Sequence, residues 1–495
     1  MSPRKRKVLV LVEWGTATTT ARFIGGALRG ASDRFALVAG SLSEEGALQE
    51  VARAAGHETL GLGCESTLDR LRAVGTLARY LRTRQVDLVH AHEERCALLA
   101  ACAARLAPGT RVVYHRHHSF ALTVPWLLMD TWAGAAAARV LAVAEAQRTT
   151  IATQHPSWSP KLFTALNGTS FEDDPVASAR EGERLRSELA LPQGTPVLVH
   201  VARLNYAKGH PHLFAALAIL RAEGLAAPLV LVGDGPDRSA LEARVAELGL
   251  RGVHFVGNAA RVQPWFCLAD VALLPSVTEA APLVVVEAMA AGKPLVASRI
   301  AGIPEMAVDG ETAILVPPGD PPALAKAIAT YLRDEPRRRR DGVAARREYE
   351  QRLTAARMMQ RWESHYAAVL GMGAGLALVV PARDRESEVE LLLRIDVDRR
   401  AERHLEGNRE GPGKGALGSE IIRVDDVDRA VGQEVRSRAQ AVERERRERR
   451  AKRARARHDH RPRRGFRGRH RHDRGCPRLV EPGDRAIDVR SRPQR

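Results

Sequence analysis

The chain has 495 residues, of which 45% are hydrophobic and 4% aromatic, so it can bury a large core and is not globally disordered. It carries 76 Lys and Arg against 59 Asp and Glu, and this net charge of +17 raises nucleic acid or an anionic membrane as partners. The last quarter, 371–495, holds 33 of the basic and 22 of the acidic residues. Five scattered cysteines without CxxC spacing indicate neither a disulfide framework nor a zinc site, which favours a reducing cytosol.

From residue 8 to about 370, short β-branched runs alternate with helical stretches rich in Ala and Leu. In the first half we expect strands at 8–12, 35–39, 88–91, 112–115 and 139–143. The alternation restarts after about 190, with strands expected at 197–201, 229–232, 253–256, 271–274 and 294–297. Apolar strands separated by helices are typical of parallel sheets covered on both faces. The sequence therefore predicts an α/β protein with two doubly wound, Rossmann-like domains, 1–185 and 190–370.

The remaining residues, 371–495, lack this alternation and become rich in Arg. Such a composition buries too little apolar surface to fold alone, so we expect a disordered, low-complexity basic tail with at most one charged helix around 430–457. A shifted reading frame in GC-rich DNA would give the same composition. The apolar stretch 367–380 is shorter than the about 20 residues of a membrane-spanning helix, so no such helix is expected.

The most informative segment is PSVTEAAPLVVVEAMAAGKPLVAS, residues 275–298. It follows an expected strand, and Pro282 suits the first turn of a helix. Glu279 then lies in the loop before the helix, and Glu287 lies about one turn inside it. The free backbone N–H groups around Ala281–Leu283 would form an anion site between the carboxylates, at the strand ends where open α/β sheets bind ligands. The alternative is a helix with two solvated glutamates.

Two further loops follow expected strands of the second domain. In HVARLNYAKG, Arg203 and Lys208 lie on one loop, where two cations suit a diphosphate, although a basic pair in a loop is often merely solvated. In LVLVGDGP, Gly233 and Gly235 permit a tight turn and close approach of a ligand. The glycine turn alone is a weak signal, because many strand-to-helix turns look like it.

In this order, these motifs resemble those of family 4 of the retaining GT-B glycosyltransferases. The family pattern is G-R-L-x-x-x-K-G, V-G-x-G-P, V-x-F-x-G, then the two-glutamate segment, then G-x-P-E. This chain matches it at 202–209, 232–236, 253–257, 275–294 and 302–305. The resemblance extends over about 8–370. It implies two Rossmann-like domains facing a cleft, and metal-independent transfer of a sugar from a nucleotide diphosphate sugar with retention of configuration.

The resemblance also implies roles for single residues. Arg203 and Lys208 would grip the donor diphosphate, Glu279 would contact the transferred sugar, and Glu287 would bind the ribose. A family histidine beside the reacting sugar follows the form V-V-Y-x-x-H, which places it on His117, with His115 and His118 as alternative registers. The implied catalytic residues are Glu279, His117, Arg203 and Lys208, and the implied donor-binding residues add Gly15, Gly233, Gly235, Ala281, Pro282, Leu283 and Glu287.

Some positions depart from the family pattern. The usual Glu-Gly-Phe is Glu279-Ala280-Ala281, which removes an aromatic side chain and leaves the donor sugar open. The usual Gly-Gly of the N-terminal loop is Gly15-Thr16, and Ala301 stands where a second glycine is common before G-x-P-E. None of these changes removes a charged catalytic group.

Two other groups of residues have the side chains and the close spacing of a metal site. His90, His92 and Glu93 in LVHAHE put both imidazoles on one face of a strand, which favours packing, then contact with a substrate, over a metal. Asp396 and Asp398 form an Asp-x-Asp motif outside the expected domains, beside two arginines. We therefore expect no metal and no cofactor apart from the donor substrate.

The sequence thus predicts a cytoplasmic glycosyltransferase acting on a glycan, a lipid-linked sugar or a small molecule. Peripheral contact with the inner face of the membrane, through Arg4–Lys7 and Arg79–Arg84, is a further expectation, and nucleic acid is not expected as a partner. The alternative is a scaffold whose Arg-rich tail binds nucleic acid or anionic lipid. An epimerase or a phosphorylase on the same fold is disfavoured, because neither has this Arg/Lys loop or a pyridoxal phosphate lysine here.

Overall fold

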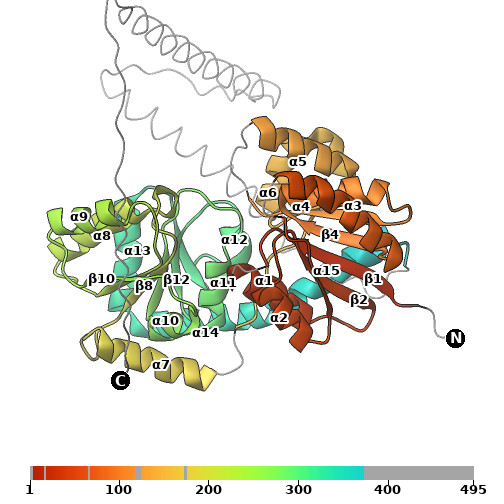
Figure 1. Cartoon of the computed structure of the whole chain (residues 1–495). Helices are drawn as coiled ribbons and strands as arrows, with labels where there is room; N and C mark the ends of the chain where they lie inside the picture. The colour runs from red at the N-terminus through yellow and green to blue at the C-terminus, as the bar shows by residue number, and fades with distance from the viewer. Residues whose placement is uncertain (1–3, 16–17, 65–66, 119–123, 172–174, 373–495) are drawn as a thin grey trace, which may run out of the picture. The chain divides into compact units, whose positions relative to one another are not determined.

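The computed structural model describes residues 4–15, 18–64, 67–118, 124–171 and 175–372 (Figure 1). The predicted basic tail with its charged helix, the Asp396–Asp398 motif and Thr16 lie outside these residues. Within the described ranges, no helix has the length and apolar character needed to cross a bilayer.

The first half of the described chain forms a parallel sheet of seven strands in the order β3-β2-β1-β4-β5-β6-β7. These are β1 (Arg6–Val12), β2 (Phe35–Ser41), β3 (Glu58–Gly61), β4 (Leu88–His92), β5 (Arg111–Arg116), β6 (Arg139–Ala142) and β7 (Leu162–Thr164). The helices between them are α1 (Thr18–Arg29), α2 (Ala47–Ala54), α3 (Thr67–Thr83), α4 (Glu93–Arg105), α5 (Val124–Ala136) and α6 (Glu145–Gln154).

The second half repeats this architecture with six parallel strands in the order β10-β9-β8-β11-β12-β13. These are β8 (Leu198–Val201), β9 (Leu229–Val232), β10 (Val253–Gly257), β11 (Val271–Leu274), β12 (Leu295–Ser298) and β13 (Ala313–Val316). The helices are α7 (Pro175–Glu188), α8 (His210–Ala222), α9 (Arg238–Glu247), α10 (Gln263–Leu268), α11 (Leu283–Ala290), α12 (Ile303–Met306), α13 (Pro321–Arg333), α14 (Glu335–Glu348) and α15 (Ala355–Val369).

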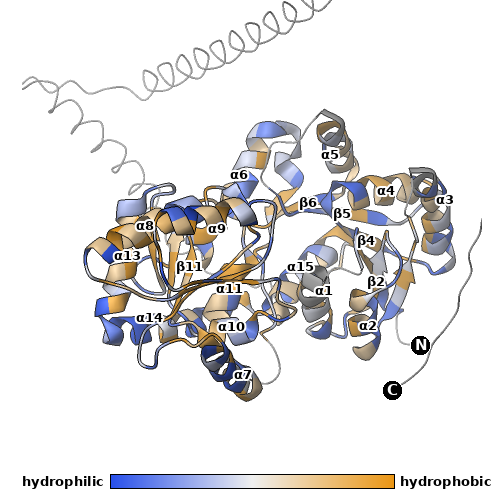
Figure 2. Ribbon diagram, turned by 60° about the vertical axis from the view of Figure 1, so that its left-hand side comes forward, coloured by the Kyte–Doolittle hydropathy of each residue, from blue (hydrophilic) through white to orange (hydrophobic). Residues whose placement is uncertain are grey.

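The predicted pair of doubly wound parallel sheets is therefore confirmed. Ten strands lie where the apolar runs predicted them, and β3, β7 and β13 were missed. The missed strands have three or four residues each, and β3 and β7 are the edges of their sheet. Figure 2 shows why the central strands were visible in sequence, since β11 carries hydrophobic colours whereas α7 and α14 are largely hydrophilic.

The last described helix, α15, packs on the first sheet rather than on the second. Its Trp362 and Tyr366 are fully buried and lie in one apolar cluster with Val8, Val10 and Phe23 of the N-terminal half. The chain reaches this position through a backbone crossing, in which Thr169 N–H donates to Leu353 O and Ala355 N–H donates to Thr169 O. The first sheet therefore needs the C-terminal end of the described chain to complete its core.

Beneath α15 lies a patch of four imidazoles, His90, His92, His115 and His117, which we call the histidine quartet. Strands β4 and β5 pair with His92 opposite His115, so alternate residues of both strands place these rings on one face. The indole ring of Trp362 meets His90, His92 and His115 edge-on, with centroid distances of 4.8–5.8 Å.

The quartet is uncharged in the folded state. Burial lowers the pKa of His90, His92 and His115 well below 6.5, and it lowers the pKa of His117 to about 3. These rings take up protons below their unfolded pKa, near 6.5, once the chain unfolds. Acid therefore favours the unfolded chain, and the stability from keeping them neutral is present above that pKa and lost as the pH falls.

We expect the free energy of unfolding to fall between pH 7 and pH 5 by about 1 kcal/mol per pH unit for each titrating histidine. His115→Gln removes one such group and reduces the slope, which denaturant melts at several pH values measure. The control Leu213→Ala, in the core of the second sheet, lowers stability at every pH and leaves the slope unchanged. An equal slope in the His115→Gln variant contradicts the assignment.

Ala301, in the loop between β12 and α12, has a backbone φ of 46°. This is the left-handed region, which costs an L-residue about 1–2 kcal/mol and which glycine adopts freely. Ala301→Gly removes this strain but gives the unfolded chain more freedom, so we expect a net gain of about 0.5–1 kcal/mol. Chemical denaturation measures it. Ala243→Gly on the exposed side of α9 is the control, where the same change costs about 1 kcal/mol. A loss of stability in both variants would refute the role of φ.

Candidate functional site

Two loops of the second sheet meet at the carboxyl ends of adjacent strands. Arg203 and Lys208 lie on the loop after β8, and Glu279 lies on the loop after β11, the strand that pairs with β8. Gly209 has φ 73°, and a Cβ there would overlap the carbonyl oxygen of Pro275. Glycine at this position therefore allows the Lys208 loop to press against the start of the Glu279 loop.

This close approach creates an ion pair between the two loops. Lys208 Nζ lies 2.6 Å from Glu279 Oε1, and Ser276 Oγ donates to the same oxygen at 2.7 Å. The Glu279 side chain is only 7% exposed, whereas Lys208 keeps 25% of its side chain accessible. Arg203 is exposed and has no ion-pair partner within the described residues. The arrangement therefore holds one carboxylate in place and leaves cationic groups accessible to an anion.

The predicted glycine turn after β9 lies against the Arg203 loop. Gly233 has φ 139°, and a Cβ there would overlap Ala202 O, while a Cβ on Gly235 would overlap Leu204 O. Leu204 N–H donates to Asp234 O at 3.0 Å. These glycines therefore let the turn after β9 pack directly against the backbone of the loop that carries Arg203.

Helix α11 follows the Glu279 loop, as the two-glutamate segment predicts. Pro282 is its N-cap residue, Leu283 its first helical residue, and Glu287 lies half-buried in its second turn. Ala281 is buried, and its carbonyl oxygen accepts a hydrogen bond from Asn167 Nδ2 at 3.0 Å. Asn167 therefore ties the N-terminal half to the loop that carries Glu279.

On the N-terminal side, Gly15 follows β1 and donates its backbone N–H to Ser43 Oγ at 3.0 Å. The three candidate histidines at the carboxyl end of β5 differ in their surroundings. His115 is fully buried, and His118 Nε2 lies 2.9 Å from Glu94 Oε2. His117 is half-buried, and its Nε2 lies 2.7 Å from His92 Nδ1.

A chain of contacts joins the histidine loop to the Glu279 loop. Gln147 of α6 donates to the carbonyl oxygen of His118 at 2.7 Å. The N-terminus of α6 in turn donates its Glu145 and Ala146 N–H groups to the carboxylate of Glu305, at 2.7 and 2.8 Å. Glu305 belongs to the G-x-P-E motif, whose Gly302 donates its N–H to Ala280 O at 2.7 Å. Because a carboxylate at a helix N-terminus also meets the positive end of the helix dipole, Glu305 stabilises this junction. The sequence indicated the G-x-P-E motif, but not that its glutamate binds the N-terminus of α6.

Two groups of described side chains have the composition of a cation site. His90, His92 and His115 offer ligand atoms within 4.8 Å of one another, as do Glu93, Glu94 and His118. Hydrogen bonds already use several of these atoms, since His90 bonds to Tyr366 Oη at 2.7 Å and to His115 at 3.2 Å. Burial raises the pKa of Glu93 to about 7, against the lowering effect of His118. We assign no ion to either group.

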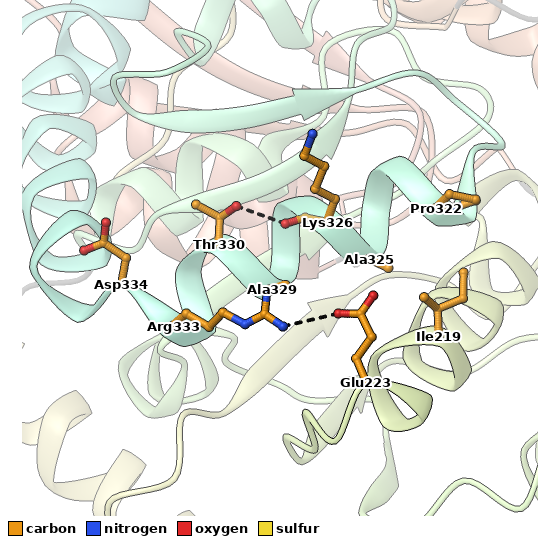
Figure 3. Close-up of a pocket in the computed structure, with 9 residues that line it drawn as sticks. All are labelled: Ile219, Glu223, Pro322, Ala325, Lys326, Ala329, Thr330, Arg333 and Asp334. Atoms are coloured by element: carbon orange, nitrogen blue, oxygen red, sulfur yellow. Dashed lines mark hydrogen bonds and ion pairs between the residues drawn. The ribbon is translucent and has the colours of Figure 1, made fainter.

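A hollow of about 560 Å³ lies elsewhere, between α8 and α13 (Figure 3). Glu223 and Arg333 form an ion pair of 3.3 Å across it. It lies at the C-terminal end of α8, whereas Lys208 precedes the N-terminal end, so a helix of 13 residues, about 20 Å, separates the two. The hollow is therefore distinct from the candidate site.

Comparison with known proteins agrees with this geometry. Residues 195–334 match the family described as "Glycosyl transferases group 1", and residues 17–169 match "Glycosyltransferase Family 4". The chain is 30% identical to the N-acetyl-alpha-D-glucosaminyl L-malate synthase of Bacillus anthracis over 41% of this chain and 53% of that protein. It is 28% identical to the putative glycosyltransferase EpsD of Bacillus subtilis over 60% of this chain and 80% of that protein. The first of these matches spans about half the length of the relative.

Solved structures show the same fold. The Anabaena protein Alr3699/HepE, solved in complex with UDP, superimposes with a TM-score of 0.62 at 22% identity, over 73% of this chain and all of that one. Sucrose-phosphate synthase from Thermosynechococcus elongatus superimposes with a TM-score of 0.61 at 21% identity, over 74% of this chain and all of that one. With its two doubly wound sheets and its ordered motifs, the chain belongs to the family 4 glycosyltransferases and has the GT-B fold.

Proposed function

We propose that the protein transfers a sugar from a nucleotide diphosphate sugar to an acceptor hydroxyl, with retention of configuration and without a metal. The observation that carries this proposal is the Lys208–Glu279 ion pair, which joins the loops after β8 and β11. Arg203 lies on the first of these loops. These loops follow β8 and β11, between which the strand order reverses, and open α/β sheets bind their ligands at such a point. Family membership supports this enzyme over a scaffold.

Breaking the bond between the sugar C1 and the phosphate oxygen leaves negative charge on the diphosphate. Arg203 and Lys208 are the groups that would stabilise this charge, and fixed charges of this kind lower a barrier by several kcal/mol. The new bond forms between C1 and the acceptor oxygen, and the acceptor proton passes to the departing diphosphate. Lys208 is already paired with Glu279. If its ammonium also binds the diphosphate, it fixes the distance between the diphosphate and the carboxylate that contacts the sugar.

On this proposal Glu279 accepts a hydrogen bond from the transferred sugar, and Glu287 accepts from the ribose. The donor site is also lined by the backbone of Gly15, Gly233, Gly235 and Ala281–Leu283. Among the three histidines, His117 is the one we place beside the reacting sugar, because His115 is fully buried and His118 is bonded to Glu94.

The relatives suggest which substrates to test first. The Anabaena protein was solved with UDP and with UDP-glucose, so uridine diphosphate sugars come first as donors. Other relatives are a D-inositol 3-phosphate glycosyltransferase and a 2-deoxystreptamine glucosyltransferase, so small polyhydroxylated acceptors stand beside glycans and lipid-linked sugars. A lipid-linked acceptor would also give a role to the peripheral membrane contact that the basic N-terminal residues suggest.

UDP at millimolar concentration is expected to raise the melting temperature of the full chain. GDP and ADP are tested in parallel at the same concentration. For whichever diphosphate binds, Arg203→Ala weakens binding about 10- to 100-fold, because a hydrogen bond to a charged group contributes about 1.5–3 kcal/mol. Calorimetric titration measures this loss. Arg251→Ala, just before β10 at the opposite end of the sheet, is the matched control and keeps the affinity. No shift with any nucleoside diphosphate would contradict the proposed function.

Glu279→Gln is expected to reduce turnover about 100- to 1000-fold, the scale seen when one preorganised group is removed from an active site. Binding of the nucleoside diphosphate persists within a few-fold, because the glutamine keeps the shape of the site. Product formation from labelled donor measures turnover, and Glu247→Gln on the exposed surface of α9 serves as control. Unchanged turnover in Glu279→Gln would exclude the role given to Glu279.

A further inference from the structure

The bond between His92 and His117 has a direction that the structure allows us to assign. His92 is the last residue of β4 and is 4% exposed, and its Nδ1 lies 2.7 Å from Nε2 of His117. The two ring planes are inclined by only 22°, with centroids 5.0 Å apart. The histidine that we place beside the reacting sugar is thus held by a second, buried histidine.

Each of these imidazoles carries a single proton, because burial lowers the pKa of His92 well below 6.5 and that of His117 to about 3. In a bond between two neutral imidazoles, one ring donates its N–H and the other accepts. Two arrangements therefore exist. Either His92 donates from Nδ1 to Nε2 of His117, or His117 donates from Nε2 to Nδ1 of His92.

The remaining nitrogen of His92 distinguishes these arrangements. His92 Nε2 is buried and has no hydrogen-bond partner within the described part of the chain. If His117 donated, the proton of His92 would lie on Nε2 as a buried N–H without an acceptor, which is rare in folded proteins. If His92 donates from Nδ1, Nε2 is merely an acceptor without a donor, which proteins tolerate more often. Donation from His92 Nδ1 to His117 Nε2 is therefore favoured.

This direction of the hydrogen bond fixes the tautomer of His117. With Nε2 accepting from His92, its own proton lies on Nδ1, and no group of the described residues bonds to that nitrogen. Phe23 meets the His117 ring edge-on with centroids 5.6 Å apart, and Trp362 meets the His92 ring at 5.3 Å, so both rings are restrained. The structure thus leaves one oriented N–H donor free for a ligand.

The backbone next to His92 is strained. Glu93, the next residue, has φ 67°, in the left-handed region that non-glycine side chains rarely adopt. Such strain persists only where surrounding structure over-determines the conformation, and it concentrates at functional sites. The turn at Glu93 ends β4 directly after His92 and begins α4, so it terminates the strand at the residue that bonds to His117.

We propose that His92 is a positioning residue, which fixes His117 as the Nδ1–H tautomer so that His117 donates one hydrogen bond to an oxygen of the reacting sugar. The second half of this statement rests on the proposed function. The first half concerns the tautomer alone and is measurable without substrate.

The experiment uses the full chain labelled with ¹⁵N-histidine, in which long-range ¹H–¹⁵N correlations report the tautomer of each ring. The His117 signals are identified by their loss in His117→Gln. We expect the Nδ1–H tautomer in the wild type, and a shift toward the Nε2–H tautomer in His92→Leu. The carboxamide of asparagine places an N–H near the position of Nδ1, so His92→Asn restores the wild-type tautomer. His92→Gln, whose amide lies near the position of Nε2, is the matched control that does not restore it.

Kinetics test the consequence for turnover. We expect kcat to fall about 10- to 100-fold in His92→Leu and His92→Gln, with the KM for the donor within a few-fold of wild type and with near-complete recovery in His92→Asn. An Nε2–H tautomer of His117 in the wild type would overturn the proposal whatever the activity, and equal kcat in all four proteins would overturn the positioning role. A wild-type chain that binds no nucleoside diphosphate, yet shows the Nδ1–H tautomer, would refute the proposed function instead.

Discussion

The ion pair between Lys208 and Glu279 is the interaction around which the candidate site is built. It exists because β8 and β11, far apart in the chain, are neighbours in the sheet, and parallel strands present their carboxyl ends at one edge. The residues that make it possible are small, since Gly209 lets the two loops approach and Ser276 orients the carboxylate. This partly buried ion pair thereby fixes the position of the accessible Lys208 ammonium.

The two sheets are joined by polar contacts at the candidate site and by apolar packing away from it. Glu305 binds the N-terminus of α6, and Asn167 binds the backbone of the Glu279 loop. Helix α15 then returns to the first sheet and covers the histidine quartet with Trp362 and Tyr366. The imidazoles next to His117 are therefore kept dry and neutral by a helix that comes from the far end of the described chain.

Sequence reasoning succeeded where structure depends on local pattern. Ten strands were visible because each is a continuous apolar run between helices, and α11 was visible because a proline starts it and Gly292 follows its end. Strand β3, with partly exposed Thr59 and Leu60, pairs only with β2, and its four residues carry no periodicity of their own. The glycines after β9 were recognised, and the structure adds that a Cβ on either one would overlap the backbone of the neighbouring Arg203 loop.

By itself, the sequence determined the two α/β domains, the family and the residue types of the candidate site, because these follow from apolar periodicity and from motifs of a few consecutive residues. Only the tertiary structure decided which of these residues touch. Lys208 meets Glu279 across 71 positions of sequence, His92 meets His117 across 25, and Glu305 meets the N-terminus of α6 across 160. Such contacts depend on strand order and register, and these depend on how all the buried faces pack together rather than on any single segment.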